Sequence, residues 1–456
     1  MNAVRGSSKM IVVGAGLSGS EAALSLASWG YQVKIYEQKP KNFSAAHKLS
    51  GAAELVCSNS FKSVELSSAH GLLKEELRQL NSPLLASAWD ARLPGGKALT
   101  IEREKFSELV TERLKSHPLI EFVSEEVTMI PESEGPVLIA AGPLASDSLI
   151  QSVKNFLNED GLYFYDATSP VVELESLDFS RFFWASRNQE SKDYLNLALN
   201  REEYDRFREN VLAAEKVVSH IEGEELKFFE GCLPIEVLAE RGAETLACSC
   251  MSPSGFGELC PPDTFAVIQF RRERAAGELL SMVGFQTRMK WPEQERVFRM
   301  LPGMQNANFV RLGAMHRNTF LNAPKHLTDR LESKARPGLY FAGQLTGSEG
   351  YTEALATGHY AAMMMVGAEN LPEVTAIRSL ARYLHQSDPA NFQPMNFNFG
   401  LLPPLSAAQG KIKGARRKQM RNLLRSEIAL AGLSEWLKLH PQFGATGLSD
   451  FSKVAL

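Results

Sequence analysis

The feature that most constrains the fold is a glycine-rich turn near the N-terminus, which reads Gly14-Ala15-Gly16-Leu17-Ser18-Gly19. A β-branched run, residues 10–13, precedes the turn directly, and residues 20–29 after it have the composition of a helix. Residues 32–36 then have the pattern of a second strand. Residues 9–36 are therefore predicted to form one βαβ unit.

Each glycine of this turn has a separate role in a dinucleotide-binding fingerprint. Gly14 permits the tight turn, Gly16 lets the backbone approach a pyrophosphate, and Gly19 allows close packing of helix on strand. The helix N-terminus adds unpaired amides and the positive end of its dipole. Glu37 ends the second strand, at the distance where an acid accepts hydrogen bonds from ribose hydroxyls. Cofactor binding is accordingly assigned to Gly14, Ala15, Gly16, Leu17, Ser18, Gly19 and Glu37.

Two later segments favour FAD over NAD as the bound dinucleotide. Residues 137–142 look like the strand-into-glycine stretch of two-dinucleotide flavoproteins, and residues 338–343 resemble their C-terminal flavin box. That box usually ends in Gly-Asp, whereas here Gly343 is followed by Gln344, which can still bond a hydroxyl. Gly350 and the helix after it would place amides against the flavin. The middle of the chain has no second strand-linked fingerprint, so NADH or NADPH is expected to visit the flavin transiently.

The alternation of strand-like and helix-like segments divides the chain into three parts. The βαβ rhythm fills residues 1–165 and returns in 326–456, whereas 166–325 consist of aromatic strand-like pieces and one polar helix expected at 201–219. We therefore expect an α/β fold: a Rossmann-like FAD-binding domain made of both ends, with an α+β domain inserted between them. The second FAD-domain part ends in a basic helical segment.

Composition limits the partners and the compartment. With 49 Lys and Arg against 53 Asp and Glu, the net charge of −4 does not indicate a general nucleic-acid binder, and no DNA partner is expected. The longest near-continuous apolar stretch, 361–368, is far too short to span a membrane. Five cysteines in 456 residues argue for a reducing compartment, the cytoplasm.

Binding of RNA would need a local basic cluster. Residues 411–425 carry seven cations and no acid. The alternatives are a solvated helix face, or a binding face at Arg271, Arg272 and Arg274. The candidate cations are Lys411, Lys413, Arg416, Arg417, Lys418, Arg421 and Arg425.

Two cysteines stand in sequence contexts that could activate a thiol. Cys232 precedes Pro234, which fits the first turn of a helix ending near Gly242, so its pKa is expected to be lowered. Cys57 precedes Ser-Asn-Ser, which reads as helix-capping residues. The alternative for either is a small buried hydrophobe. No metal site is expected from the three other cysteines, which have no nearby histidine, namely Cys248, Cys250 and Cys260.

Four sequence blocks, two of which contain Cys57 and Cys232, resemble those of a known family. The chain resembles the folate- and FAD-dependent tRNA (uracil-5-)-methyltransferases, the TrmFO or Gid family, over nearly its whole length. The blocks that carry the resemblance are Ala53-Glu-Leu-Val-Cys-Ser-Asn-Ser60, Phe229-Glu-Gly-Cys-Leu-Pro-Ile-Glu236, Met315-His-Arg-Asn-Thr-Phe320 and Gln393-Pro-Met-Asn-Phe-Asn-Phe-Gly-Leu-Leu-Pro-Pro404.

The resemblance implies an enzyme that forms 5-methyluridine in RNA, at the T-loop uridine in position 54 of tRNA. Methylenetetrahydrofolate would donate the one-carbon unit, reduced flavin would carry and reduce it, and NADH or NADPH would supply the electrons. The alternatives are the same chemistry on a 23S ribosomal RNA uridine, or a flavin-binding RNA-binding protein without methyl transfer.

The same resemblance suggests roles for the site residues. Uracil C5 becomes nucleophilic after a thiolate adds to C6, a role given to Cys232, with Cys57 as the assisting thiol or base. The reverse assignment stays open. His316 and Arg317 are candidates to orient folate or uracil, the alternative being a surface pair.

Overall fold

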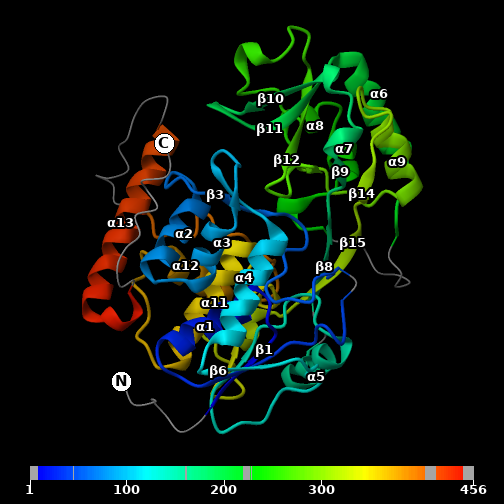
Figure 1. Cartoon of the computed structure of the whole chain (residues 1–456). Helices are drawn as coiled ribbons and strands as arrows, with labels where there is room; N and C mark the ends of the chain where they lie inside the picture. Colours follow the sequence, from blue (N-terminus) through cyan, green and yellow to red (C-terminus); the bar gives the residue numbers. More distant parts are fainter. Residues whose placement is uncertain are drawn as a thin grey trace.

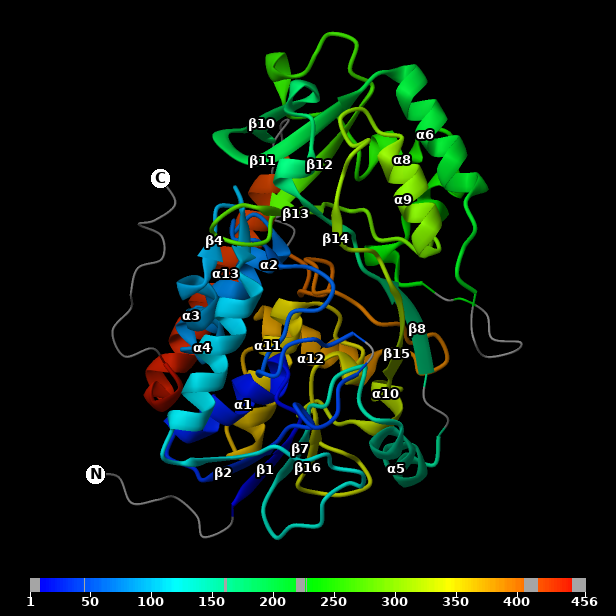
Figure 2. The ribbon, with the colours of Figure 1, turned by 45° about the vertical axis from the view of Figure 1, so that its right-hand side comes forward.

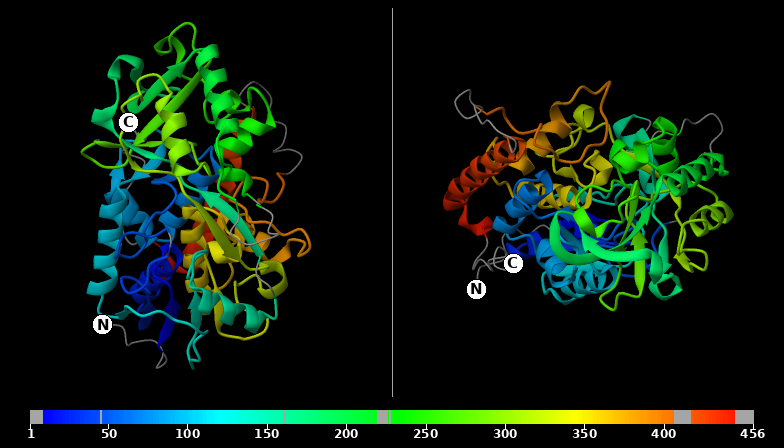
Figure 3. Two further views of the ribbon diagram at one scale, coloured as in Figure 1. Left: turned by 90° about the vertical axis from the view of Figure 1, so that its right-hand side faces the viewer. Right: turned by 90° about the horizontal axis from the view of Figure 1, so that it is seen from above.

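The computed structural model describes residues 9–44, 46–159, 162–218, 226, 228–405 and 417–444. These residues form two lobes, one above the other in Figures 1 and 3. The lower lobe contains segments from both ends of the sequence, and the upper lobe contains the middle of the chain. Nowhere in the described part of the chain is a helix long and apolar enough to cross a membrane.

The lower lobe is built on a five-stranded sheet in the order β16-β7-β1-β2-β6, whose neighbouring strands all pair in parallel. Its strands are β1 (Met10–Val13), β2 (Val33–Tyr36), β6 (Ile120–Val123), β7 (Val137–Ile139) and β16 (Leu339–Phe341). Helix α1 (Leu17–Ser28) connects β1 to β2, so the predicted βαβ unit and the Rossmann-like sheet are confirmed.

Both ends of the sequence contribute to the core of this lobe. Helix α11 (Tyr351–Met365) packs on α1, where a side chain on Gly358 would meet the Ser18 carbonyl at 2.3 Å. Ser18 Oγ donates to the Ala354 carbonyl at 2.7 Å across the same contact. The helices around it are α2 (Ala69–Gln79), α3 (Pro83–Asp90), α4 (Arg103–Ser116), α5 (Asp147–Leu157), α10 (Ala323–His326), α12 (Ala376–Gln386) and α13 (Arg417–Leu439).

A small three-stranded sheet in the order β3-β5-β4 lies on the side of this lobe that faces the upper one. Its strands are β3 (Ser60–Ser63), β4 (Arg92–Leu93) and β5 (Ala98–Ile101).

The upper lobe has a six-stranded antiparallel sheet in the order β10-β11-β12-β13-β9-β14 and a separate apolar core. The strands are β9 (Val171–Glu173), β10 (Phe182–Ser186), β11 (Gln189–Leu199), β12 (Ala266–Arg272), β13 (Leu279–Met282) and β14 (Phe309–Arg311). Its helices are α6 (Arg201–Ala213), α7 (Ile235–Arg241), α8 (Thr245–Cys248) and α9 (Trp291–Arg299). Helix α6 ends before the predicted residue 219, because Ala214 is extended and the chain then forms a bridge from Lys216 to Met289.

A two-stranded antiparallel ribbon, β8 (Leu162–Ala167) with β15 (Met315–Phe320), runs between the lobes (Figure 2). The predicted domain boundary after residue 165 falls inside β8, and the one after residue 325 falls inside α10. The domain limits stay predictions. The ribbon matters for function because both of its strands also reach the cavity described next.

Candidate functional site

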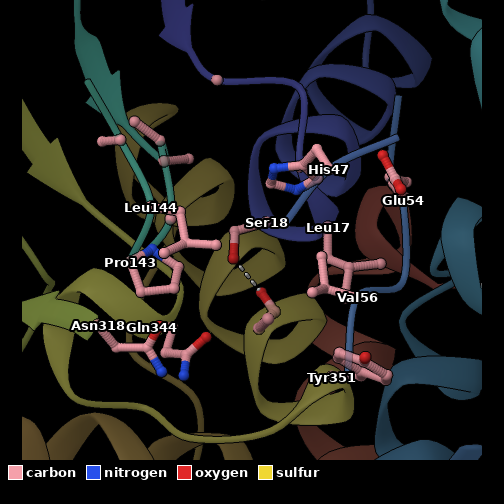
Figure 4. A pocket seen from close by; sticks show the side chains of 18 of the residues that line it. Leu17, Ser18, His47, Glu54, Val56, Pro143, Leu144, Asn318, Gln344 and Tyr351 are labelled. Carbon is pink, nitrogen blue, oxygen red and sulfur yellow. Dashed lines mark hydrogen bonds between the residues drawn. The ribbon is translucent and has the colours of Figure 1, made fainter. Parts of the chain in front are cut away.

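Most of the predicted site residues line one cavity. It opens where the carboxyl end of β1 meets the N-terminal ends of α1 and α11, the usual place for a ligand in a parallel sheet. Figure 4 shows Leu17 and Ser18 on one side of it, Pro143 and Leu144 across from them, and Gln344 near the ribbon. The cavity then continues to the ribbon and to those residues of the upper lobe that lie nearest to the lower lobe.

The three fingerprint glycines are needed for two different reasons. Gly14 has a φ of +98°, and a Cβ there would lie 2.6 Å from the Ala140 carbonyl oxygen. A Cβ on Gly19 would lie 1.8 Å from the Gly14 oxygen, so both positions are fixed by the packing of the chain itself. By contrast, a Cβ on Gly16 would meet no described atom within 4 Å. Gly16 therefore leaves open space in the cavity, as a closely approaching pyrophosphate requires.

Helix α1 offers its first amides to this space. Its N-cap is Gly16, and among the described residues no side chain caps the helix or places an acid in its first turn. The Glu37 carboxylate is held nearby by the amides of Ala15 and Lys39, each at 3.0 Å. Unpaired amides beside a fixed acid suit a phosphate next to a ribose. These residues fit a bound dinucleotide.

The predicted C-terminal flavin box forms another wall of the cavity. Gln344 Nε2 donates to Glu349 Oε2 at 2.6 Å, so the Gln344 amide has a defined orientation. Helix α11 begins after Gly350, whose φ of +110° favours glycine. Burial raises the pKa of Glu349 to about 8. Ala15, Leu17, Ser18, Gln344 and Gly350 line the cavity, whereas Gly343 lies just behind them, against the Ser18 side chain.

Both predicted cysteines line the same cavity although they come from different lobes. Cys57 lies in the loop before β3, and its Sγ is 3.2 Å from the Tyr351 hydroxyl, which also accepts from the Cys57 amide at 3.0 Å. Cys232 ends a 3₁₀ turn, Glu230–Cys232, at the edge of the upper lobe. The expected helix after Cys57 is wrong: Ser60 begins strand β3 instead.

The expectation of a lowered Cys232 pKa is also wrong for this structure. The thiol lies three residues before the short helix α7, and burial together with the nearby Asp166 raises its pKa well above the usual value. Burial and Asp166 likewise raise the pKa of Cys57 to about 11. Both thiols are therefore protonated at neutral pH until a ligand or a proton acceptor changes their surroundings.

Two acids that line this cavity near both thiols were not anticipated, and Glu54, Glu125 and Glu126 line it as well. Asp166 lies on β8 with 9% of its surface exposed, and burial raises its pKa to about 7. The other acid is Glu349. Their sequence signals were one acid inside the otherwise aromatic and apolar strand 162–167, and one acid inside the glycine-rich turn 347–350. Arg271, considered before only as part of an RNA-binding face, also lines the cavity. Further cavity residues that the sequence analysis missed are His47, Lys62, Asn318 and Tyr351.

The ribbon separates the two predicted substrate-orienting residues. His316 pairs with Asp166 across the ribbon and lines the cavity. Arg317 pairs with Tyr165, and its guanidinium lies 4.2 Å from the centre of the Tyr163 ring. Because successive side chains of a strand point to opposite faces, His316 faces the cavity and Arg317 does not. A role of Arg317 in orienting folate or uracil stays a prediction.

The predicted basic cluster is only partly described. Lys411, Lys413 and Arg416 lie outside the described residues. The other four cations line a surface groove with Ala69, residues 398–400 and Asn422, and in the described structure they form no ion pair. These four are Arg417, Lys418, Arg421 and Arg425.

The alternative RNA-binding face in the upper lobe stays a prediction, and each of its three cations already contacts other described side chains. Arg271 is buried and donates to Asn59 and Ser58 at 2.6 and 3.0 Å. Arg272 lies over the Trp184 ring. Arg274 pairs with Glu104 at 2.7 Å and with Glu278 at 3.5 Å.

The remaining cysteines show no metal site. In the part of the chain that the structure describes, no three His, Cys, Asp or Glu side chains gather as ligands would. All five cysteines are free thiols.

Comparisons with known proteins agree with this geometry. The sequence model of the family described as Glucose inhibited division protein A matches residues 9–370. A Geobacter sulfurreducens protein named methylenetetrahydrofolate--tRNA-(uracil-5-)-methyltransferase TrmFO is 48% identical, the match covering 93% of this chain and 98% of that protein. An Aquifex aeolicus protein of the same name is 46% identical, with 94% and 96% covered.

A solved structure shares the fold. The chain is similar to Aquifex aeolicus GidA with a TM-score of 0.63 at 15% identity, covering 97% of this chain and 77% of that one.

Proposed function

The chain belongs to the TrmFO family, within the wider group of GidA-like proteins, and on this premise we propose that it methylates uracil C5 in tRNA. Methylenetetrahydrofolate is the one-carbon donor, FAD the cofactor, and NADH or NADPH the electron source. The target is the T-loop uridine, position 54, and the cytoplasm is the compartment. One observation carries the proposal: two thiols from different lobes, Cys57 and Cys232, share the cavity into which the dinucleotide fingerprint opens.

The first part of the cavity holds the cofactor. Gly16 and the first amides of α1 would bind the pyrophosphate, Glu37 would accept from the ribose hydroxyls, and Gly350 at the start of α11 would help to hold the flavin. When bound, FAD supplies the reducing equivalents that turn a one-carbon unit into a methyl group. The mouth of the cavity, between the lobes, admits the nucleobase.

Cys232 is the nucleophile in this proposal. Its sulfur adds to uracil C6, which places negative charge on C5 and O4 and makes C5 able to attack a one-carbon electrophile. Since the Cys232 pKa is raised, the thiolate must be generated when the substrate binds, by loss of the thiol proton to a neighbouring group. Cys57 is the assisting thiol, held in place by Tyr351 on the side of the flavin box.

A covalent trap tests this assignment. RNA with 5-fluorouridine at the target should form a stable adduct with the enzyme, because fluorine at C5 cannot leave as a proton. Cys232→Ala should abolish the adduct and keep the bound flavin, whereas Cys57→Ala should still capture the RNA. Cys248→Ala, at an exposed thiol, is the matched control and should behave as the unaltered enzyme.

Peptide mapping of the trapped complex identifies the attached residue. Attachment at Cys57 would exchange the two roles, and attachment at neither cysteine would contradict thiol addition. Nucleoside mass spectrometry of tRNA and ribosomal RNA from a deletion strain then identifies the substrate. Loss of 5-methyluridine from ribosomal RNA alone would contradict the tRNA assignment.

A further inference from the structure

We propose that Asp166 is the base that removes the C5 proton of the uracil after Cys232 has added to C6. This inference rests on the proposed function and assigns to one carboxylate a step that would otherwise fall to Cys57. It follows from the position of Asp166 in the cavity that it shares with both thiols. It follows also from the Asp166 oxygen for which the described residues provide no hydrogen-bond or ion-pair partner.

The ribbon fixes the direction of the Asp166 side chain. Asp166 pairs directly with His316 across β8 and β15, and both line the cavity. Asn318, two residues after His316, lines it as well and lies beside Gln344 in Figure 4. The cavity-facing side of the ribbon therefore carries polar groups, and Asp166 is its only acid within the described residues.

Asp166 is buried but forms only one hydrogen bond within the described residues. Its Oδ1 accepts from the Ala167 amide at 2.8 Å, and the described residues give it no other hydrogen-bond or ion-pair partner. Its other carboxylate oxygen has no partner among the described residues and is accessible in the cavity, where a ligand can reach it. By comparison, Glu349 already accepts from Gln344 at 2.6 Å.

Asp166 lines the same cavity as both thiols. Its charge is the largest electrostatic contribution to the raised pKa of Cys57 and also to that of Cys232. Burial raises the pKa of Asp166 to about 7, which suits a base acting at neutral pH. With its pKa at about 11, the Cys57 thiol is mostly protonated at that pH and is a poor proton acceptor.

The step balances without any further reactant. In the adduct, C6 carries the Cys232 sulfur, and C5 carries its original hydrogen together with the newly added group, which is the one-carbon unit in methylation or a solvent proton in exchange. The Asp166 carboxylate takes the original hydrogen as a proton, and the electron pair of the C5–H bond forms the C5–C6 double bond. The C6–S bond breaks at the same time, and the sulfur leaves as thiolate.

Hydrogen exchange at C5 tests this step apart from methyl transfer. When Cys232 adds to C6, C5 takes a proton from solvent, and the removal of tritium then lets the addition reverse, so the flavin-containing enzyme without folate should release tritium from tRNA labelled at C5 of the target uridine. For Asp166→Asn we expect tritium release to fall by at least about 100-fold, while the adduct with 5-fluorouridine RNA still forms. Asp166→Glu should recover part of the release. Glu349→Gln, the other buried acid, provides the comparison.

The outcomes separate this inference from the proposed function. If the unaltered enzyme gives neither adduct nor exchange, thiol addition itself fails, and both fall together. If the adduct and exchange occur and Asp166→Asn still exchanges, only the role of Asp166 is overturned. Loss of the adduct as well would place Asp166 in the addition step and also overturn the proposal, and loss of exchange in Glu349→Gln alone would give the role to Glu349.

A pH profile of exchange by the unaltered enzyme tests the proposal even if Asp166→Asn fails to fold. The rate should fall as the pH drops through about 7, because the base becomes protonated. The titratable groups that face Asp166 are His316 across the ribbon, Cys57, Cys232 and Glu349, with Lys62 beside them. A rate that stays constant between pH 8 and about pH 5 would overturn the proposal.

Discussion

At the scale of single residues, the surroundings of a side chain decide what it can do, more than its type. Gly14, Gly16 and Gly19 belong to one motif, yet only Gly16 faces open space. Asp166 and Glu349 are both buried acids of one cavity, yet only Glu349 has a side-chain partner. The open space at Gly16 and the unengaged oxygen of Asp166 are therefore the two places where a ligand is expected to complete the structure.

Gly16→Val should yield protein without flavin. The added isopropyl group would occupy the space left for the pyrophosphate, while its Cβ would meet no described atom within 4 Å. The flavin absorbance of the purified protein measures the outcome. Ser28→Val, at the exposed end of the same helix, should keep the flavin. Full flavin content in Gly16→Val would contradict the fingerprint assignment.

At the scale of elements, helices distant in sequence are joined through buried polar groups. Glu76 on α2 accepts from the amides of Ala376 and Ile377, at 2.6 and 2.9 Å, and so caps the start of α12. Burial nevertheless raises the pKa of Glu76 to about 8, the two amides offsetting only part of the cost. The contact that holds α12 against α2 is therefore sensitive to pH.

Glu76→Gln should flatten the pH dependence of stability. An acid whose pKa is raised in the folded state contributes stability below its unfolded pKa, near 4.5, and loses it as the pH rises through about 8. This single group changes the free energy of unfolding by at most about 1.4 kcal/mol per pH unit. Urea unfolding at several pH values between these limits measures the slope. Glu75→Gln, next to it on the outer side and paired with Arg78, should leave the slope unchanged. An equal slope in Glu76→Gln would contradict the raised pKa.

At the scale of the whole molecule, the site exists only because the two lobes meet. The lower lobe supplies the fingerprint and Cys57, the upper lobe supplies Cys232, and the ribbon adds Asp166. The described part of the basic cluster lies elsewhere, on α13 at the side of the lower lobe (Figure 1). A large RNA could contact this helix while its target base enters the cavity between the lobes.

Neutralising the four groove cations of α13 should weaken tRNA binding and reduce its salt dependence. Each phosphate contact contributes about 0.7 to 0.9 to the log–log slope, so the slope should fall by up to about 3. Filter binding at several salt concentrations measures it, with flavin reduction expected to stay unchanged. The control replaces three cations of the upper lobe that already have acidic partners, Arg201, Lys290 and Arg299. A slope unchanged by the α13 variant would move the RNA-binding face elsewhere.

The sequence by itself determined the features that depend on neighbouring residues. The turn of Gly14, Gly16 and Gly19 between a strand and a helix can form only one kind of βαβ unit, because its backbone requirements are local. The apolar periodicity of residues 69–80 and 102–116 is also local and predicts two helices, and the observed helices α2 and α4 lie within one residue of these ends. The family resemblance identified Cys57 and Cys232, and the structure brings them to one cavity.

Only the tertiary structure decided the electrostatics and the direction of side chains. The pKa of Cys232 depends on burial and on Asp166, which is 66 residues away in the sequence (232 − 166), so the local helix argument gave the wrong sign. His316 and Arg317 are neighbours in sequence, but strand pairing turns them to opposite faces. The burial of a side chain, its distance from other charges and the face to which it points all depend on contacts between distant segments. The local sequence therefore does not predict them.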